Sequence, residues 1–332
     1  MSITKVKKRL PIAMETNISI TPFINRVGAF FLDGIILGIV GSIIGYSFED
    51  YFVSIGNNGL YVGLTIALLY FTISNSRLLN GQTLGKRVLK IQVVDKEGNT
   101  LQIDKSFYRA LILCVPYFTI NLNIPGISEG SSLYIIKSMI LFAILLGIII
   151  IYSFNKGTRQ SIHDLLVGSY VVSIARAETP AILPKVTKYA YYIWGGFIAL
   201  MIGINLLSIT AKSPSMGSAN KIYKSLSKID GIIQAGVSKN VHRLYGKEKK
   251  VTHSIRTTLR VAKLPKNLNN IEKEKIVRLA AKTILNEEPT INNVDLIVIT
   301  LTKGFNIGIA KSNFSYSIGK TPSEWREILK NE

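Results

Sequence analysis

Long apolar stretches alternate with short polar segments along the first two thirds of the chain, and this pattern stops near residue 209. The stretches that approach membrane length lie at residues 23–46, 58–76, 106–123, 133–153 and 189–209. Crossing a bilayer takes about 20 mostly apolar helical residues. The third stretch is the weakest, because Pro116 interrupts it and Asn121 and Asn123 lie near its end. The pattern predicts a polytopic α-helical membrane bundle of about five helices, and it leaves open whether residues 106–123 cross.

Basic residues gather in alternate connecting segments. The tail at residues 1–22 carries four lysines and arginines, the segment at 77–105 carries six, and the segment at 154–188 carries five. Such segments stay in the cytoplasm. We therefore expect a multi-pass protein of the cell membrane with a cytoplasmic N-terminus. Both large basic segments lie in the cytoplasm only if residues 106–123 cross, so we favour crossing and expect the C-terminal domain to be extracytoplasmic. If residues 106–123 lie on the membrane surface instead, the segment at 154–188 and the C-terminal domain lie on the opposite sides.

Residues 219–332 have the pattern of a soluble α+β domain that follows a flexible linker at 210–218. Alternation predicts a strand with one buried face at 251–263, and a helical apolar period predicts a helix at 270–287. A continuous apolar run predicts a buried strand at 294–301, and Pro322 marks the start of a last helix. We expect a helix packed on an antiparallel sheet.

Two charged residues, Arg26 and Asp33, lie within the first apolar stretch. A charge at the bilayer centre costs about 2.5–3.5 kcal/mol on insertion scales, so these side chains must face protein or water. Their spacing places them on one helical face, about 10 Å apart along the axis, and we expect each to have another partner. Both are candidate functional charges.

The same stretch carries a row of small residues, Gly34, Gly38, Gly41 and Gly45. Glycines at this spacing let another helix approach closely. The row therefore predicts helix packing within one subunit, with homo-oligomerisation through this face as the alternative.

Residues 81–87, Gly-Gln-Thr-Leu-Gly-Lys-Arg, connect the second stretch to an alternating segment at 88–95. That segment predicts a strand, and residues 100–103 are expected to return as the second strand of a small β-hairpin in this cytoplasmic loop. Gly81 and Gly85 are one residue too close for a phosphate-binding loop, and Arg87 follows Lys86 where a hydroxyl residue is needed. No nucleotide site is predicted.

A polar motif with Arg159, His163 and Asp164 follows the fourth stretch. A histidine beside a carboxylate can pass protons near neutral pH. Alternatively, Asp164 caps a helix or pairs with Arg26, Arg87 or Arg109 in a structural network.

Composition adds two constraints. Mean hydropathy is +0.30 and the net charge is +20, and residues 210–332 hold 22 basic and 10 acidic residues, a net charge of +12. This excess predicts an anionic envelope component or a protein partner for the C-terminal domain. A nucleic acid is not expected, because the basic patch at 243–250 holds a single aromatic residue, Tyr245, and is explained more simply as a solvated charged loop. No nucleophile–base pair or metal-ligand spacing is present, so we expect no enzyme, cofactor or metal.

The order of these motifs resembles the RDD family of membrane proteins. The resemblance covers about residues 22–175, and the arginine and two aspartates that name the family correspond to Arg26, Asp33 and Asp164. The chain departs from the usual pattern at Asn155, where an aspartate is common, and at residues 167–169. The resemblance implies an integral membrane protein, with transport and cation/proton exchange suggested for some members.

Two functions follow as expectations. The first is transport of a cation, proton or small solute, with Asp33 as the group that alternately binds and releases it. Five helices are few for a complete path, so this version implies an oligomer. The second is a non-transporting membrane anchor, or an assembly or regulatory factor, that presents the C-terminal domain to a partner.

Overall fold

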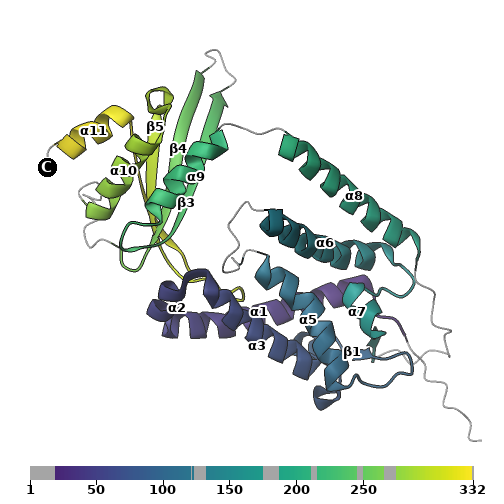
Figure 1. Ribbon diagram of the computed structural model, residues 1–332. Coiled ribbons are helices and arrows are strands. Elements are labelled where there is room, and N and C mark those ends of the chain that lie inside the picture. Colours follow the sequence, from purple (N-terminus) through teal and green to yellow (C-terminus); the bar gives the residue numbers. More distant parts are fainter. Residues whose placement is uncertain are drawn as a thin grey trace, which may run out of the picture. The chain divides into compact units, whose positions relative to one another are not determined.

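The computed structural model describes residues 19–120, 122, 132–174, 187–210, 215–244, 250–264 and 274–330 (Figure 1). Most of the predicted basic tail, of the linker and of the basic patch at 243–250 lies outside the residues whose side chains are described. The chain divides into two compact units. One comprises Met1–Ile35, Ala67–Ile120 and Ile135–Ile198, and the other comprises Ile36–Ile66, Asn121–Tyr134 and Ala199–Glu332.

The apolar stretches form helices. They are α1 (Phe23–Ser47), α2 (Glu49–Ile55), α3 (Gly59–Ser74), α5 (Ile103–Thr119), α6 (Ser132–Phe154) and α8 (Tyr189–Thr210), with the short η1 (Gly56–Asn58) between α2 and α3. Among the described residues, three segments are long and apolar enough to cross a membrane: Phe23–Ser47, Glu49–Ser74 and Leu133–Phe154. Tyr189–Ile204 is a shorter apolar helix. A helical membrane part is therefore plausible, and the count of five crossings stays a prediction.

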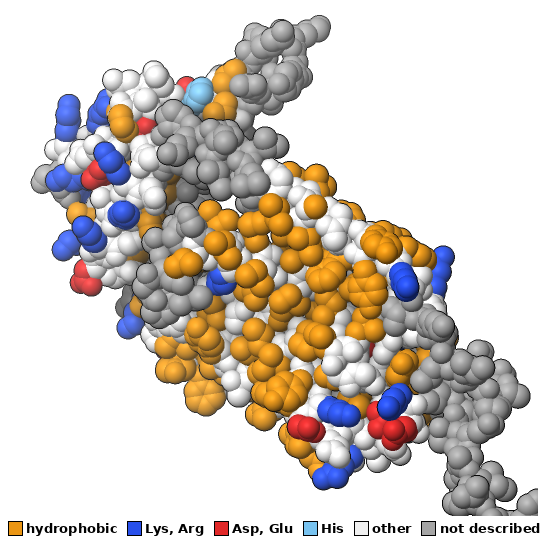
Figure 2. All heavy atoms as spheres, turned by 45° about the vertical axis from the view of Figure 1, so that its right-hand side comes forward, with side chains coloured by type: hydrophobic (Ala, Val, Ile, Leu, Met, Phe, Trp, Pro, Cys, Tyr) orange, Lys and Arg blue, Asp and Glu red, His pale blue; other side chains and the backbone are white. Residues whose placement is uncertain are grey.

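The outward faces of these helices are apolar. Phe31 and Ile43 of α1 and Ile140 and Ile149 of α6 are all more than half exposed. Figure 2 shows such side chains covering much of the helical part, with lysine, arginine and acidic side chains gathered at one end. Monomeric soluble proteins rarely expose contiguous apolar surface on this scale, whereas lipid-facing helices require it.

A two-stranded sheet joins distant parts of the first unit. β1 (Ile91–Val94) pairs antiparallel with β2 (Tyr170–Ser173), so that Ile91 lies opposite Ser173 and Val94 opposite Tyr170. The predicted hairpin between residues 88–95 and 100–103 is wrong, because the second segment contributes only the isolated bridges Val94–Thr100 and Ser76–Leu101, and α5 begins at Ile103. Strand β2 buries both faces of β1, since Val171 packs with Ile91 and Val93 on one face and Val172 packs with Val94 on the other.

Three short helical segments flank this sheet. They are η2 (Arg77–Leu79), α4 (Leu84–Val88) and α7 (Ile162–Val167). α4 leads directly into β1, and α7 leads directly into β2. The paired strands therefore fix α4 and α7, which carry the polar motifs, relative to each other.

The C-terminal region is an α+β fold. It contains α9 (Ser215–Leu226), β3 (Ile232–Leu244), β4 (Lys250–Val261), α10 (Lys275–Glu287), η4 (Ile291–Asn293), β5 (Leu296–Lys303), β6 (Phe314–Lys320) and α11 (Pro322–Lys330). The strand order is β3-β4-β5-β6, and β4 and β5 run parallel. The sheet is mixed: β3–β4 and β5–β6 are antiparallel as expected, but the expectation is wrong for β4–β5. There α10 forms the crossover connection that parallel neighbours require.

The core of this region lies between the sheet and its helices. Val277, Ala280, Ala281 and Ile284 of α10 are fully buried at the spacing of one helical face. They belong to one cluster with buried residues of β4 and β5 and with Trp325 of α11. Figure 1 shows α9 and α10 on the same face of the sheet.

Candidate functional site

The centre of the polar network in the first unit is Asp164, at the start of α7. Its side chain is fully buried. The guanidinium of Arg26 donates to Oδ2 at 2.5 Å, and Arg109 of α5 donates to Oδ1 through Nε at 2.9 Å, with its Nη2 at 2.8 Å. The hydroxyl of Ser169 also donates to Oδ1, at 3.1 Å. One carboxylate therefore joins α1, α5 and α7.

Arg26 has further contacts that fix its direction. It donates to the carbonyl oxygen of Arg159, and its guanidinium lies 4.8 Å from the ring centroid of Tyr152 on α6. The Tyr152 ring in turn stacks on Phe23 at 4.8 Å, and its hydroxyl donates to the Phe23 carbonyl. Arg159 adopts a positive φ of 53°, which presents its carbonyl oxygen to α1. Arg26 is thus held by α6 and by the loop before α7.

Asp33 has a different set of partners and does not pair with Arg26. Its carboxylate is 1% exposed. It accepts hydrogen bonds from the Tyr70 hydroxyl at 2.6 Å, from the Thr83 hydroxyl at 2.6 Å and from the Gly85 N–H at 2.8 Å. Thr83 is the N-cap residue of α4, so the carboxylate lies against free N–H groups of that helix. These bonds attach α4 to α1.

Gly85 is required by this close approach. A Cβ there would collide with the carbonyl oxygen of Ala29 on α1 and would come within 3.0 Å of the Asp33 carboxylate. At Gly81 a glycine is favoured for a different reason, because its φ is +65°. The carbonyl oxygen of Gly81 accepts a hydrogen bond from the Val93 N–H. Both glycines thus serve to position the loop between α3 and β1.

Lys86 and Arg87 are neighbours in α4 with opposite orientations. The ammonium group of Lys86 donates to the side-chain oxygen of Asn75 at the end of α3. Arg87 is exposed. Only the first of the two belongs to the polar interior.

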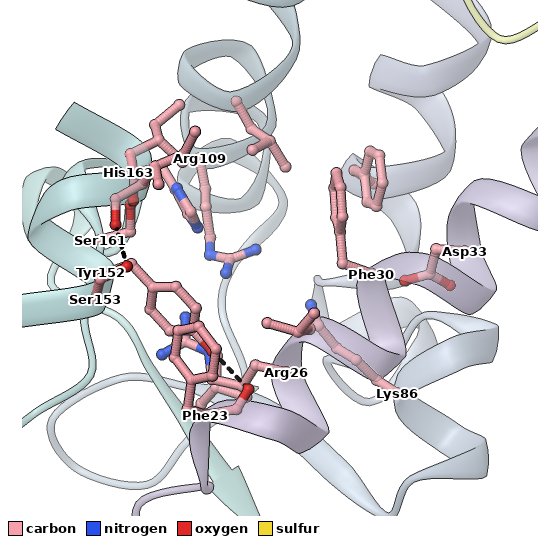
Figure 3. Close-up of a pocket in the computed structure, with 16 residues that line it drawn as sticks. Phe23, Arg26, Phe30, Asp33, Lys86, Arg109, Tyr152, Ser153, Ser161 and His163 are labelled. Atoms are coloured by element: carbon pink, nitrogen blue, oxygen red, sulfur yellow. Dashed lines mark hydrogen bonds between the residues drawn. The ribbon is translucent and has the colours of Figure 1, made fainter. Parts of the chain in front are cut away.

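A cavity of about 300 Å³ lies among α1, α3, α4, α5, α6 and α7 (Figure 3). Its lining includes Arg26, Lys86 and Arg109 together with Asp33 and His163. Figure 3 shows Lys86 and Asp33 on one side of the cavity, His163 on the opposite side, and the Arg109 guanidinium reaching between them. The remaining lining residues are mostly aromatic or aliphatic, and Phe30 and Phe71 stack with centroids 6.5 Å apart.

Burial changes the proton affinities of the groups on α4 and α7. Burial of the ring lowers the pKa of His163 to about 3. The charge of Asp164 raises this pKa, and the charge of Arg109 lowers it further. Burial by itself raises the pKa of Asp164, but the charges of Arg109 and Arg26 outweigh it and hold that pKa well below its ordinary value. Burial and the charge of Arg109 also lower the pKa of Lys86 well below its usual range. This favours a structural network over proton transfer near neutral pH for His163 and Asp164.

Two glycines of the predicted row on α1 face a loop segment and not a second helix. Within the second unit, a Cβ at Gly41 would meet Ile309 and a Cβ at Gly45 would meet Phe305, both in the segment between β5 and β6. A Cβ at Gly38 would lie 3.7 Å from the Ile309 carbonyl oxygen, and a Cβ at Gly34 would have nothing within 4 Å. Two glycines thus accommodate a non-helical segment of the C-terminal region.

Sequence reasoning left several partners unassigned. Tyr70 and Thr83 were not singled out, although Tyr70 is a tyrosine inside an apolar stretch and Thr83 stands at a helix start, which are both usable signals. Asn155, the departure from the family pattern, is buried and donates to Thr158 and to the Gln160 carbonyl. An amide can donate those bonds and an aspartate cannot. Among the described residues, no group of three histidine, cysteine or acidic side chains could hold a metal ion.

Comparison with known proteins covers the helical part. Residues 20–168 match the sequence profile described as RDD family. The "Uncharacterized protein YckC" of Bacillus subtilis (strain 168) is 26% identical over 156 residues, which make up 46% of this chain and 84% of that protein. No solved structure matches the chain. Neither the profile's description nor the relative's name states an enzymatic activity.

Asp164→Asn is expected to destabilise the protein strongly, because two buried guanidinium groups lose their counter-charge. Breaking a buried ion pair in this way costs about 3–5 kcal/mol. The measurement is the apparent melting temperature of the full chain in non-ionic detergent. The matched control is Asp104→Asn, an exposed carboxylate in the first turn of α5, whose loss costs at most about 1 kcal/mol. Equal shifts for the two variants would contradict the network.

His163→Gln is expected to reduce the acid sensitivity of the fold. With a native pKa of about 3, His163 stays neutral while the unfolded chain takes up a proton below about pH 6.5. The unfolded state then binds more protons, so stability falls as pH drops, by up to about 1.4 kcal/mol per pH unit. Melting temperatures between pH 7 and pH 5 measure this. The variant should lose less than wild type, and the exposed His253→Gln control should lose as much; a parallel loss in all three would refute the neutral ring.

Proposed function

Residues 20–168 form an RDD family domain, and on that premise we propose that this multi-pass membrane protein moves a small solute by way of the cavity between its helices. The domain lies in the cell membrane with its N-terminus in the cytoplasm, and the C-terminal domain is extracytoplasmic. Motif order in the sequence and the family match support the membrane assignment. Transport is the inference added here.

The observation that carries this proposal is the cavity itself. Ionisable side chains within a membrane domain are costly, and they commonly mark solute or ion pathways. Here Arg26, Arg109 and Lys86 reach one cavity from three different helices. Two of the surrounding helices, α1 and α6, are among the segments able to cross a membrane. A charged cavity of 300 Å³ within such a bundle is large enough for a small solute.

The contacts of Asp33 favour a solute other than a free cation. Its carboxylate already accepts three hydrogen bonds from Tyr70, Thr83 and Gly85. These bonds occupy three of the roughly four lone-pair sites of the carboxylate, which leaves little room to coordinate a cation. The cations lining the same cavity would also repel it. In this proposal Asp33 positions α4, and the arginines and Lys86 face the solute.

The second candidate function is that of a membrane anchor or assembly factor. A contact within the second unit favours it. Phe305 lies between Gly45 of α1 and Phe52 of α2 and is 1% exposed. Lys303 lies 3.3 Å from Asp50 and 3.8 Å from Glu49. This packing would hold residues 219–332 against helices of the membrane part, ready to present them to an anionic envelope component or a protein partner. The residues that bind such a partner are not assigned.

Cysteine accessibility distinguishes transport from anchoring without knowledge of the solute. Cys114 is the sole cysteine, so Cys114→Ala provides a background without thiols. Leu113→Cys then places one thiol in the cavity lining. A transporter that opens alternately to each side should let a membrane-impermeant maleimide label this thiol both in right-side-out and in inverted vesicles.

The control is Ile140→Cys in the same background, on the exposed apolar face of α6. In lipid its thiol should react from neither side, since the reactive thiolate is disfavoured there. Labelling of Leu113→Cys from one side alone, or from neither, would contradict transport and favour the anchor.

A further inference from the structure

The cavity in the RDD domain is lined both by charged and by apolar side chains. The charged groups are the guanidinium of Arg109, the guanidinium of Arg26 and the ammonium of Lys86. The apolar lining includes Phe30, Phe71, Leu113, Ile148 and Ile149. In Figure 3 Arg109 and Lys86 approach the cavity from different helices. A ligand that satisfies both kinds of lining must itself have a polar end and an apolar end.

The charges of the described groups do not balance. Asp164 neutralises one of the two guanidinium groups that share it. Asp33 is near enough to Lys86 to interact with it, but it is hydrogen-bonded by uncharged donors, and Lys86 itself donates to the uncharged Asn75 amide. Three basic side chains thus face two carboxylates. Burial and the charge of Arg109 lower the pKa of Lys86, so the three basic groups do not readily hold their charges together. One bound anion beside Arg109 and Lys86 would balance the excess and stabilise the protonated form of Lys86.

The rim of the cavity belongs to the apolar surface. Phe30 of α1 and Ile149 of α6 line the cavity and are also 58% and 62% exposed. Both helices are candidate membrane spans. The ligand's apolar end can therefore extend past these two side chains into the hydrocarbon of the bilayer.

The cavity volume limits what fits inside. A volume of about 300 Å³ is at the lower end of the range for small-molecule pockets. This accommodates a carboxylate or phosphate group and the first few methylenes of a chain. A longer chain must leave through the rim.

We propose that this cavity binds the single anionic headgroup of an alkyl amphiphile, with the headgroup at Arg109 and Lys86 and the chain running out between Phe30 and Ile149. The proposal rests on the proposed function, in that it names the solute class of the same cavity. The shared chemistry is a monoanionic group on an alkyl chain. A free fatty acid and an anionic phospholipid both provide it.

The test uses photo-crosslinking of the full chain in phosphatidylcholine nanodiscs. The probe is a 12-carbon fatty acid with a diazirine in its chain, and the comparison probe is the matching 12-carbon alcohol. We expect saturable labelling of α1 and α6 peptides by the acid and at least tenfold weaker labelling by the alcohol. Equal labelling by acid and alcohol would overturn the proposal.

Variants of α4 test the role of charge. Lys86→Met should weaken labelling by the acid at least tenfold, as expected when a charge-assisted hydrogen bond is lost. Lys86→Arg should retain most of it, and Arg87→Met, which removes the exposed neighbouring charge, should leave it unchanged. Wild-type labelling in a folded Lys86→Met variant would overturn the proposal. If that variant does not fold, the acid-to-alcohol ratio of the wild-type chain decides.

Competition identifies the source of the headgroup. Unlabelled dodecanoate that competes better than phosphatidylglycerol assigns a free fatty acid, and the reverse order assigns a phospholipid; both outcomes support the shared chemistry. Acetate should not compete, because it lacks the chain. If neither amphiphile competes, the labelling is nonspecific and the proposal fails. Photo-crosslinking reports binding and does not require the cavity to open to both sides of the membrane. Saturable labelling by the acid would therefore support this proposal even if maleimide labelling from one side alone contradicts transport.

Discussion

A buried carboxylate shared by two arginines is the constraint on which the helical part of this protein depends. Asp164 is fully buried, and its two oxygens face Arg26 and Arg109 on different helices. A buried charge of this kind is tolerated only when it is paired and hydrogen-bonded, and the ion pairs, together with the Ser169 hydroxyl, meet that condition. The arrangement fixes where α1, α5 and α7 lie relative to one another. It also leaves one positive charge in excess at the wall of the cavity.

The second carboxylate does comparable structural work with uncharged partners. Asp33 attaches α4 to α1 through Thr83 and Gly85, and the close approach excludes any side chain at Gly85. This contact directs Lys86 inward while Arg87 remains exposed. β1 and β2 then connect α4 to α7, so the two carboxylates belong to one framework. The framework determines which cations reach the cavity.

The sequence was informative where one physical rule dominated. Apolar length predicted α1 and α6. Alternation predicted β4, helical periodicity predicted α10 and a continuous apolar run predicted β5, each to within about five residues. Spacing also indicated that Arg26 and Asp33 are too far apart to pair directly, and the structure gives each its own partners. In each case the signal lies within a short window of sequence.

Pairings between distant segments could not be read from local patterns. β1 pairs with β2, more than 70 residues later, although the turn at 96–99 that suggested a hairpin does form. That turn returns the chain only as far as the Val94–Thr100 bridge before α5 begins at Ile103. The parallel register of β4 and β5 depends likewise on how α10 returns the chain. Arg109 was only one of three arginines considered for Asp164, and nothing local distinguishes it from Arg87. The covering of Gly45 by Phe305 joins residues about 260 positions apart.

A double-mutant cycle between Arg109 and Asp164 tests the central claim most directly. The apparent stability of the full chain in detergent is measured for Arg109→Leu, for Asp164→Leu and for the double variant. If the two side chains form a buried pair, the double variant should be more stable than the sum of the single effects implies, by about 1–3 kcal/mol. Effects that simply add would show that Arg109 and Asp164 do not interact, and would contradict the account.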